Sequence, residues 1–427
     1  MNEPIFIARQ DTLEQEILPA HWLSQYKLFG EESYTFQDKE IWKRLCMSRA
    51  AANDRDMHAE ALEEMLTTFS AEHTGKWMLT VYGMDAAVLE GLATMAAVAG
   101  NGTAMAAVAG NALLMHAITN SETAMRVIAN SQTAMQRVAN SATAMDAISG
   151  SKIARGAVQA SPYYNSYIKE NDMAIAKLAV ALASLESAGY SGMAGVAADS
   201  TAMNAVAASS TAMNAVAASA VARNAISASP YYDAKIKEND MAIAKLVVGF
   251  ANLESARYSG CAGMAADSTA MTAVAASSTA MTAVAASGVA LKAIAQAYKK
   301  TANMLQFLKA VNASDTLVKR IYSTLTNATA LFGAAQLGSQ DSVENANSWA
   351  TTSAAPNAFL ACACGYYGSS SDSVSVTYNG TVIAQKKTGT AKPGSVTSTN
   401  VNAITMAPST FTENGDGYLA VQKFTAK

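Results

Sequence analysis

At 427 residues the chain is longer than one hydrophobic core usually serves, so we expect two or three domains. Apolar residues make up 51%, charged residues only 15%, and the net charge is −3, a composition that excludes the clustered Lys and Arg of a nucleic-acid-binding surface. No uninterrupted apolar run of about 18 residues occurs, and the first residues do not resemble a secretory signal, so we expect no membrane span and a chain folded in the cytoplasm.

Residues 1–90 are denser in charge than the rest and hold most of the histidines and tryptophans. The segment 38–66 reads as one or two amphipathic helices, with Glu60, Glu63 and Glu64 on a solvated side opposite Leu62 and Leu66. We therefore predict an α-rich N-terminal domain over 1–90, able to attach to a larger assembly.

A ten-residue unit dominates the middle of the chain. Methionine recurs every ten residues and Val or Ile follows three residues later, in 91–160 and again between 193 and 294. The predicted packing residues of these units include Met95, Val98, Met105, Val108, Met125, Met135, Met203, Val206, Met213, Val216, Met271, Val274, Met281 and Val284.

The period and the offset decide what the unit can be. A strand has period two, so the offset of three would put Met and Val on opposite faces. In one continuous helix ten residues turn through about 1000°, roughly 80° short of three turns, and the stripe would wind too fast for a coiled coil. We therefore predict a short helix of about seven residues and a three-residue corner. Ser or Thr would cap each start, and a left-handed residue would close each unit at Gly100, Gly110, Asn130 and Asn140.

A larger duplication contains these units. Ser-Pro-Tyr-Tyr at 161–164 and at 229–232 opens two near-copies, and both continue through Ile-Lys-Glu-Asn-Asp-Met-Ala-Ile-Ala-Lys-Leu. We predict a helical shaft over 91–160 and two tandem repeat modules over 161–297. Stacked units would bury the Met and Val side chains, each against its neighbours, and stacking or oligomerisation would have to stabilise such short helices. A promiscuous Met-rich binding surface is the alternative for the stripe.

The C-terminal part changes character twice. Residues 298–344 read as a helical connector, with helix-like spacing of Leu305, Leu308, Val311, Leu317, Val318 and Ile321. From 345 to 427 the pattern predicts a small antiparallel β-sandwich. Its strongest signal is the alternating segment 373–378, followed by Asn379-Gly380 and the segment 381–384, which predicts a hairpin with a type I′ turn. The segments 359–362 and 418–422 would add strands. The fold class is therefore mainly α.

No residue cluster predicts catalysis, and we expect no cofactor, no metal and no enzyme activity. Cys362 and Cys364 lack the spacing and the further ligands of a metal or redox site and fit a packed strand. Lys-Glu-Asn-Asp at 169–172 and 237–240 fits helix capping, and Asp416 fits a turn better than a calcium loop. The histidines His21, His58, His73 and His116 are scattered.

The Ala-rich Ser-x-Thr-Ala-Met-x-Ala-Val-Ala units, the Ser-Pro-Tyr-Tyr modules and the β tail together resemble virion fibre proteins of tailed bacteriophages, such as tail, collar or whisker fibres. This resemblance of pattern implies a homo-oligomeric fibre, commonly a homotrimer. One end would be held by other virion proteins and the other exposed to the host surface. Residues 1–90 would attach to the particle and 345–427 would contact a host glycan or protein, with Tyr366, Tyr367 and Tyr378 as sugar-stacking candidates or, equally, as core.

Two rival functions stay open. The chain could be a purely structural collar or decoration protein that binds only virion proteins. The β tail could also hide a depolymerase or peptidase, although no paired-acid or nucleophile pattern favours that. A bacterial surface adhesin would normally need an export signal.

Overall fold

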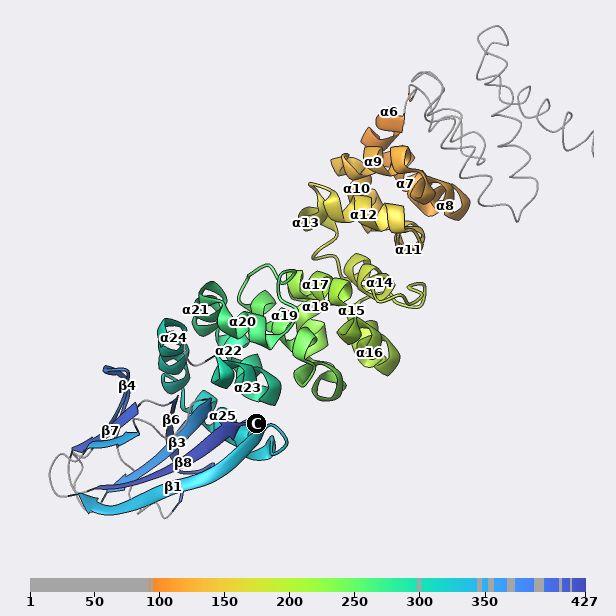
Figure 1. The fold of residues 1–427 in the computed structure, drawn as a ribbon. Helices are drawn as coiled ribbons and strands as arrows, with labels where there is room; N and C mark the ends of the chain where they lie inside the picture. The colour runs from red at the N-terminus through yellow and green to blue at the C-terminus, as the bar shows by residue number, and fades with distance from the viewer. Residues whose placement is uncertain are drawn as a thin grey trace, which may run out of the picture. The chain divides into compact units, whose positions relative to one another are not determined.

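The computed structural model describes residues 92, 95–297, 301–343, 348–351, 357–366, 373–387, 395–406, 409–414 and 417–427. The predicted domain over 1–90 lies outside these residues. The chain divides into two compact units, 1–196 and 197–427, and each is described by itself. The fold is mainly α, with an antiparallel β region at the C-terminal end, as the sequence indicates (Figure 1). Within the described residues no single helix is long and apolar enough to cross a membrane.

Short helices follow one another in the first unit. They are α6 (Met95–Gly100), α7 (Gly102–Gly110), α8 (Ala112–Asn120), α9 (Glu122–Ala129), α10 (Gln132–Ala139), α11 (Ala142–Gly150), α12 (Lys152–Ala160), α13 (Tyr164–Tyr167), α14 (Asp172–Leu182) and α15 (Met193–Ala198), which runs across the division.

The corners between these helices are tighter than the sequence suggests. A complete repeat helix has eight or nine residues, and one extended residue often ends one helix and begins the next: Asn111 is the C-cap of α7 and the N-cap of α8. The predicted left-handed closures are wrong. Asn130 and Asn140 have φ of −93° and −96°, and neither Gly100 nor Gly110 has a positive φ. The two asparagines close their helices because each side-chain amide donates to the carbonyl four residues back.

Each repeat helix packs mainly on the helix three places further along the chain. In the first unit α7 lies on α10, α8 on α11, α9 on α12 and α11 on α14. The stack therefore makes one superhelical turn for about every three ten-residue units. Stacking buries four positions per unit, and in α7 these are Ala104, Met105, Val108 and Ala109, all with 0% exposure. The prediction that each unit contacts chiefly its sequence neighbours is wrong, because the main contacts join helices one superhelical turn apart.

The second unit continues the same construction. Its helices are α16 (Ser200–Ala208), α17 (Ser210–Ala218), α18 (Ala220–Ser227), the π-helical turn η4 (Asp233–Lys237), α19 (Asp240–Phe250), α20 (Cys261–Ala266), α21 (Ser268–Ala276), α22 (Ser278–Ala286), α23 (Gly288–Gln296), α24 (Thr301–Asn312) and α25 (Asp315–Asn327). Here α19 lies on α22, α22 on α25, and α21 on α24. The axes of α21 and α22 meet at 105°, which shows how sharply one extended residue turns the chain.

Each module interrupts the ten-residue rhythm once. The helices α14 and α19 have 11 residues each, and a loop follows each before the short repeats resume. Left-handed residues occur in these loops, at Ser184 with φ of 62° and at Asn252 with φ of 57°. Left-handed backbone thus marks the end of the long module helix and not the repeat corner.

The β region begins earlier than predicted. Its strands are β1 (Phe332–Val343), β2 (Ser348–Thr351), β3 (Ala358–Tyr366), β4 (Ser373–Tyr378), β5 (Thr381–Lys387), β6 (Val401–Met406), β7 (Ser409–Asn414) and β8 (Gly417–Ala426). They form two four-stranded sheets of order β1-β8-β3-β6 and β2-β7-β4-β5. The predicted hairpin is confirmed, since β4 pairs with β5 across Asn379 and Gly380, whose φ values are 46° and 75°. The predicted strands at 359–362 and 418–422 lie in β3 and β8.

Helices cover the sheet β1-β8-β3-β6. α23 contacts β3 and β8, α24 contacts β6, and α25 contacts β6 and β1. The ring of Tyr322 in α25 meets the ring of Phe424 in β8 edge-on, with centroids 5.7 Å apart. The side chain of Asn312 completes one edge of the sheet, donating to the carbonyl of Ile404 at 2.7 Å and accepting from its N–H at 3.0 Å. One continuous apolar core therefore joins the helices from α19 to α25 to the strands.

Candidate functional site

The predicted packing residues are buried within a single chain. Every one of them, from Met95 to Val284, is at most 5% exposed. The stripe is therefore internal to the stack and is not presented as a Met-rich surface. Burial of these side chains also requires no second copy of the chain.

Serine side chains join successive turns of the stack at its corners. In the first unit the hydroxyls of Ser131, Ser141, Ser151 and Ser161 each donate to a carbonyl 32 residues earlier, at 2.5–2.6 Å. Three of the same oxygens, those of Ser131, Ser141 and Ser151, accept the N–H three residues later at 3.2 Å, as N-caps do. A single small side chain thus begins one helix and ties it to the turn before.

The Lys-Glu-Asn-Asp segments have the capping role that the sequence predicts, and a further one. Asn171 and Asn239 cap α14 and α19. The following Asp172 accepts the N–H of Met193 at 2.9 Å, and Asp240 accepts that of Cys261 at 3.0 Å, so each carboxylate caps a second helix. In the second module Glu238 also accepts from the first two N–H groups of α23, at 3.0 and 3.1 Å.

A buried lysine network in the first module is absent from the sequence prediction. The side chain of Lys177 in α14 is 2% exposed and its Nζ lies 2.5 Å from Oδ1 of Asp146 in α11. Nζ also donates to the carbonyl of Ser187 at 3.2 Å, and the Ser187 hydroxyl lies 3.2 Å from the same Asp146 oxygen. The loop after α14 therefore closes over an ion pair.

The second module repeats this network with a neutral partner. Lys245 in α19 is 0% exposed, and its Nζ donates to Oδ1 of Asn214 in α17 at 2.7 Å and to the carbonyl of Ser255 at 3.0 Å. The Ser255 hydroxyl lies 3.0 Å from the same Asn214 oxygen. Burial lowers the pKa of the Lys245 amino group, because its charge is desolvated. Comparing the two copies residue by residue would have identified this difference in the sequence.

Of the tyrosines proposed for host contact, the structure describes the surroundings of Tyr378. Tyr378, at the end of β4, is 1% exposed and is among the largest fully buried side chains, so it belongs to the core and is not a sugar-stacking residue. Burial raises the pKa of its phenol. Tyr366 is the last residue of β3, and Tyr367 lies outside the described residues, as does Asp416.

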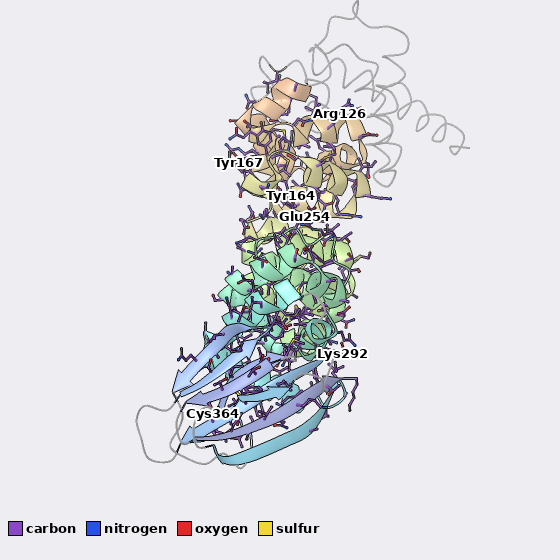
Figure 2. The ribbon with its side chains drawn as sticks, turned by 60° about the vertical axis from the view of Figure 1, so that its left-hand side comes forward. Arg126, Tyr164, Tyr167, Glu254, Lys292 and Cys364 are labelled. Atoms are coloured by element: carbon purple, nitrogen blue, oxygen red, sulfur yellow. The ribbon has the colours of Figure 1, made fainter. Side chains whose placement is uncertain are left out.

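The remaining candidates are the cysteines and the histidines. Cys362 and Cys364 are buried, at 0% and 4% exposure, and pack in β3 as the sequence predicts; Figure 2 marks Cys364 in the β region. In the part of the chain that the structure describes, no three His, Cys, Asp or Glu residues are placed to hold a metal ion. His21, His58 and His73 lie outside that part.

One surface hollow lies between α9 and α12. Small residues such as Gly156, Ala157 and Ala160 line it, and the exposed side chains of Glu122, Arg126 and Lys152 stand around it (Figure 2 labels Arg126). Charges of both signs face solvent here, and nothing in the lining fixes the orientation of a ligand.

The geometry as a whole defines a class of protein, a helical repeat stack that ends in a helix-covered β-sandwich. No protein-family model matches the sequence, and no curated protein matches it either.

Proposed function

We propose that this chain is a structural spacer in a virion, a fibre protein of a tailed bacteriophage that attaches through its N-terminal region and presents its C-terminal β region for host adsorption. The hydrogen bonds of the corner serines carry the proposal. Because corner serines such as Ser141, Ser151 and Ser229 each bond to a carbonyl 32 residues earlier, a whole module can be added or removed and equivalent bonds can form at the new junction. Length is thus the property that duplication in this chain varies.

The buried core favours a structural role over a chemical one. The most distinctive residues of the repeats, Met, Val, Ser and Asn, are used for packing and capping. The charged residues that are buried, Lys177 and Lys245, stabilise loops. This arrangement supports a spacer.

The repeat helices do not need oligomerisation to bury their apolar side chains. A homotrimer stays a prediction, but the repeats bury their own apolar face, so trimer contacts would have to come from other surfaces. A monomer could fold into this repeat stack. Measuring the oligomeric state therefore tests the proposal that the chain forms a fibre, and it does not test the fold.

The attachment half is tested on particles. Antibodies against the full chain should label phage particles at a fibre or collar, and mass spectrometry of purified particles should find the chain. Its absence from purified particles would overturn the proposal.

The adsorption half needs a gentler test than deleting 345–427. That deletion would remove strands β2 to β8, which complete the core under α23–α25, and would expose apolar surface. Purified full-length chain should instead compete with particles for host cells. If it binds particles but not cells, the alternative of a purely structural collar or decoration protein gains the support.

A further inference from the structure

Two equivalent lysines face different acceptors in the two modules. Lys177 meets the carboxylate of Asp146, and Lys245 meets the amide of Asn214, in each case with a serine hydroxyl and a serine carbonyl completing the network. The network around Lys177 therefore shows that this arrangement accommodates an aspartate.

The side-chain carbonyl of Asn214 accepts two hydrogen bonds, as the carbonyl attacked in an acyl-transfer reaction does in an enzyme. Its Oδ1 accepts from Lys245 Nζ at 2.7 Å and from the Ser255 hydroxyl at 3.0 Å, so two donors stand where negative charge would develop. Asn214 itself is only half-buried, so water can reach its side chain.

The product would also be more stable than the reactant. Lys245 is fully buried, and among the described residues it has no ion pair, whereas Lys177 has one. A buried cation without a counter-charge is unfavourable, and a carboxylate at 214 would supply that charge.

We propose that Asn214 is a self-modification site, at which water hydrolyses the side-chain amide to a carboxylate with Lys245 and Ser255 as the positioned donors. The water oxygen bonds to Cγ while the carbonyl electron pair moves onto Oδ1. The C–Nδ2 bond then breaks, and the nitrogen leaves as ammonia after taking a proton from the attacking water. Amide and water thus become carboxylate and ammonium, and the new carboxylate at position 214 pairs with Lys245.

The chain supplies its own control. Asn204 and Asn214 lie at the same place in two helices of identical sequence, Ser-Thr-Ala-Met-Asn-Ala-Val-Ala-Ala. Local sequence therefore predicts equal reactivity, and only the surroundings differ. The amide oxygen of Asn204 lies 3.3 Å from Nζ of Lys235, a lysine that is not buried.

The experiment follows both amides in the full-length chain during prolonged incubation at neutral pH in heavy-oxygen water. Peptide mass spectrometry would measure conversion to aspartate and the oxygen incorporated. We expect Asn214 to convert at least about tenfold faster than Asn204, a fraction of what one oxyanion donor contributes in enzymes. Equal rates at the two positions would overturn the proposal.

Two sets of variants test the proposal further, one by removing the donors at Asn214 and one by placing an amide in the other network. Lys245→Met and Ser255→Ala should each slow the conversion of Asn214 and leave Asn204 unchanged. Asp146→Asn places an amide against Lys177 and Ser187, so it should hydrolyse back to aspartate. Persistence of that amide would contradict the proposal, and so would a cross-link between 214 and 245 with loss of one ammonia.

Discussion

Lys177 and Lys245 each bring an amino group into the interior, where the loss of hydration is unfavourable unless the charge is paired. Lys177 has Asp146 as its partner, and Lys245 has neutral oxygens. The two lysine networks therefore have similar geometry but different electrostatics, because one contains Asp146 where the other contains Asn214.

This difference predicts an alkaline pH dependence for the second module. Burial lowers the pKa of Lys245 in the folded chain, so between that value and the higher value of the unfolded chain the unfolded state binds more protons. Stability of the packing between α17 and α19 should thus rise as the pH rises through this window. In Lys245→Met the rise should be missing, measured by hydrogen exchange of α17 and α19 peptides in freshly purified chain whose Asn214 is intact. The same rise in both proteins would show that Lys245 is not its source.

Glycine at 249 is required by a close approach. A Cβ at this position in α19 would lie 2.4 Å from the backbone carbonyl of Ala217. We expect Gly249→Ala to destabilise the second unit by about 1–3 kcal/mol, as overpacking does. Gly263→Ala in α20 is the control, because its Cβ would meet nothing within 4 Å, and it should be neutral or stabilising by up to about 1 kcal/mol. Denaturant titration of both variants measures the difference, and equal effects would contradict the close approach.

At the scale of the element, a helix of eight or nine residues is too short to be stable alone. Each one is held by its cap, by the four buried positions on one face, and by the helix one turn away. The cap residue matters most because it acts on two helices and, through its hydroxyl, on a third.

Two adjacent serines at the start of α22 allow the capping role to be tested, because one of them caps the helix and the other does not. Ser277 caps the helix, accepting from Ala280 at 3.2 Å, and donates to the carbonyl of Phe250 at 3.0 Å, whereas Ser278 is exposed. Ser277→Ala should cost about 1–2 kcal/mol, and Ser278→Ala should change stability by less than about 0.5 kcal/mol. Thermal or denaturant unfolding of the two variants checks this. A Ser278 variant as damaged as the Ser277 variant would refute the capping assignment.

At the scale of the whole molecule, the repeat should allow the length of the chain to change without loss of the fold. Removing 161–228 joins Ala160 to Ser229, which would then take the corner place of Ser161 and bond to Ala129 in place of Ala197. We expect this chain to fold, with helix content reduced in proportion and cooperative melting retained. Removing 161–223 instead puts the corners out of register and should give an aggregating chain. Circular dichroism and light scattering distinguish them, and equal folding of both would show that register is unimportant.

Much of this architecture was readable from the sequence. The ten-residue period predicted short stacked helices with Met and Val inside, and Asn379-Gly380 predicted the hairpin, because both signals are local. The start of the β region at Phe332 was not predicted. The strand β1 has no alternating pattern, and only its pairing with β8 makes it a strand.

For the candidate sites, too, the sequence predicted what depends on local pattern and missed what depends on long-range packing. Tyr378 was a possible surface residue until the packing of the sheets placed it in the core, because alternation alone does not say which face is covered. The networks around Lys177 and Lys245 join residues 31 and 41 positions apart, a separation that no local pattern reports.

By itself, then, the sequence determined the short helix of each unit, its N-cap and its duplication, since helix propensity, capping and periodicity act within about ten residues. Only the tertiary structure decided that each repeat helix stacks on the helix three places further along, that serines join turns 32 residues apart, and that one lysine meets a carboxylate while its twin meets an amide. Those outcomes depend on which distant groups the folded chain brings into contact and on how completely it removes them from water.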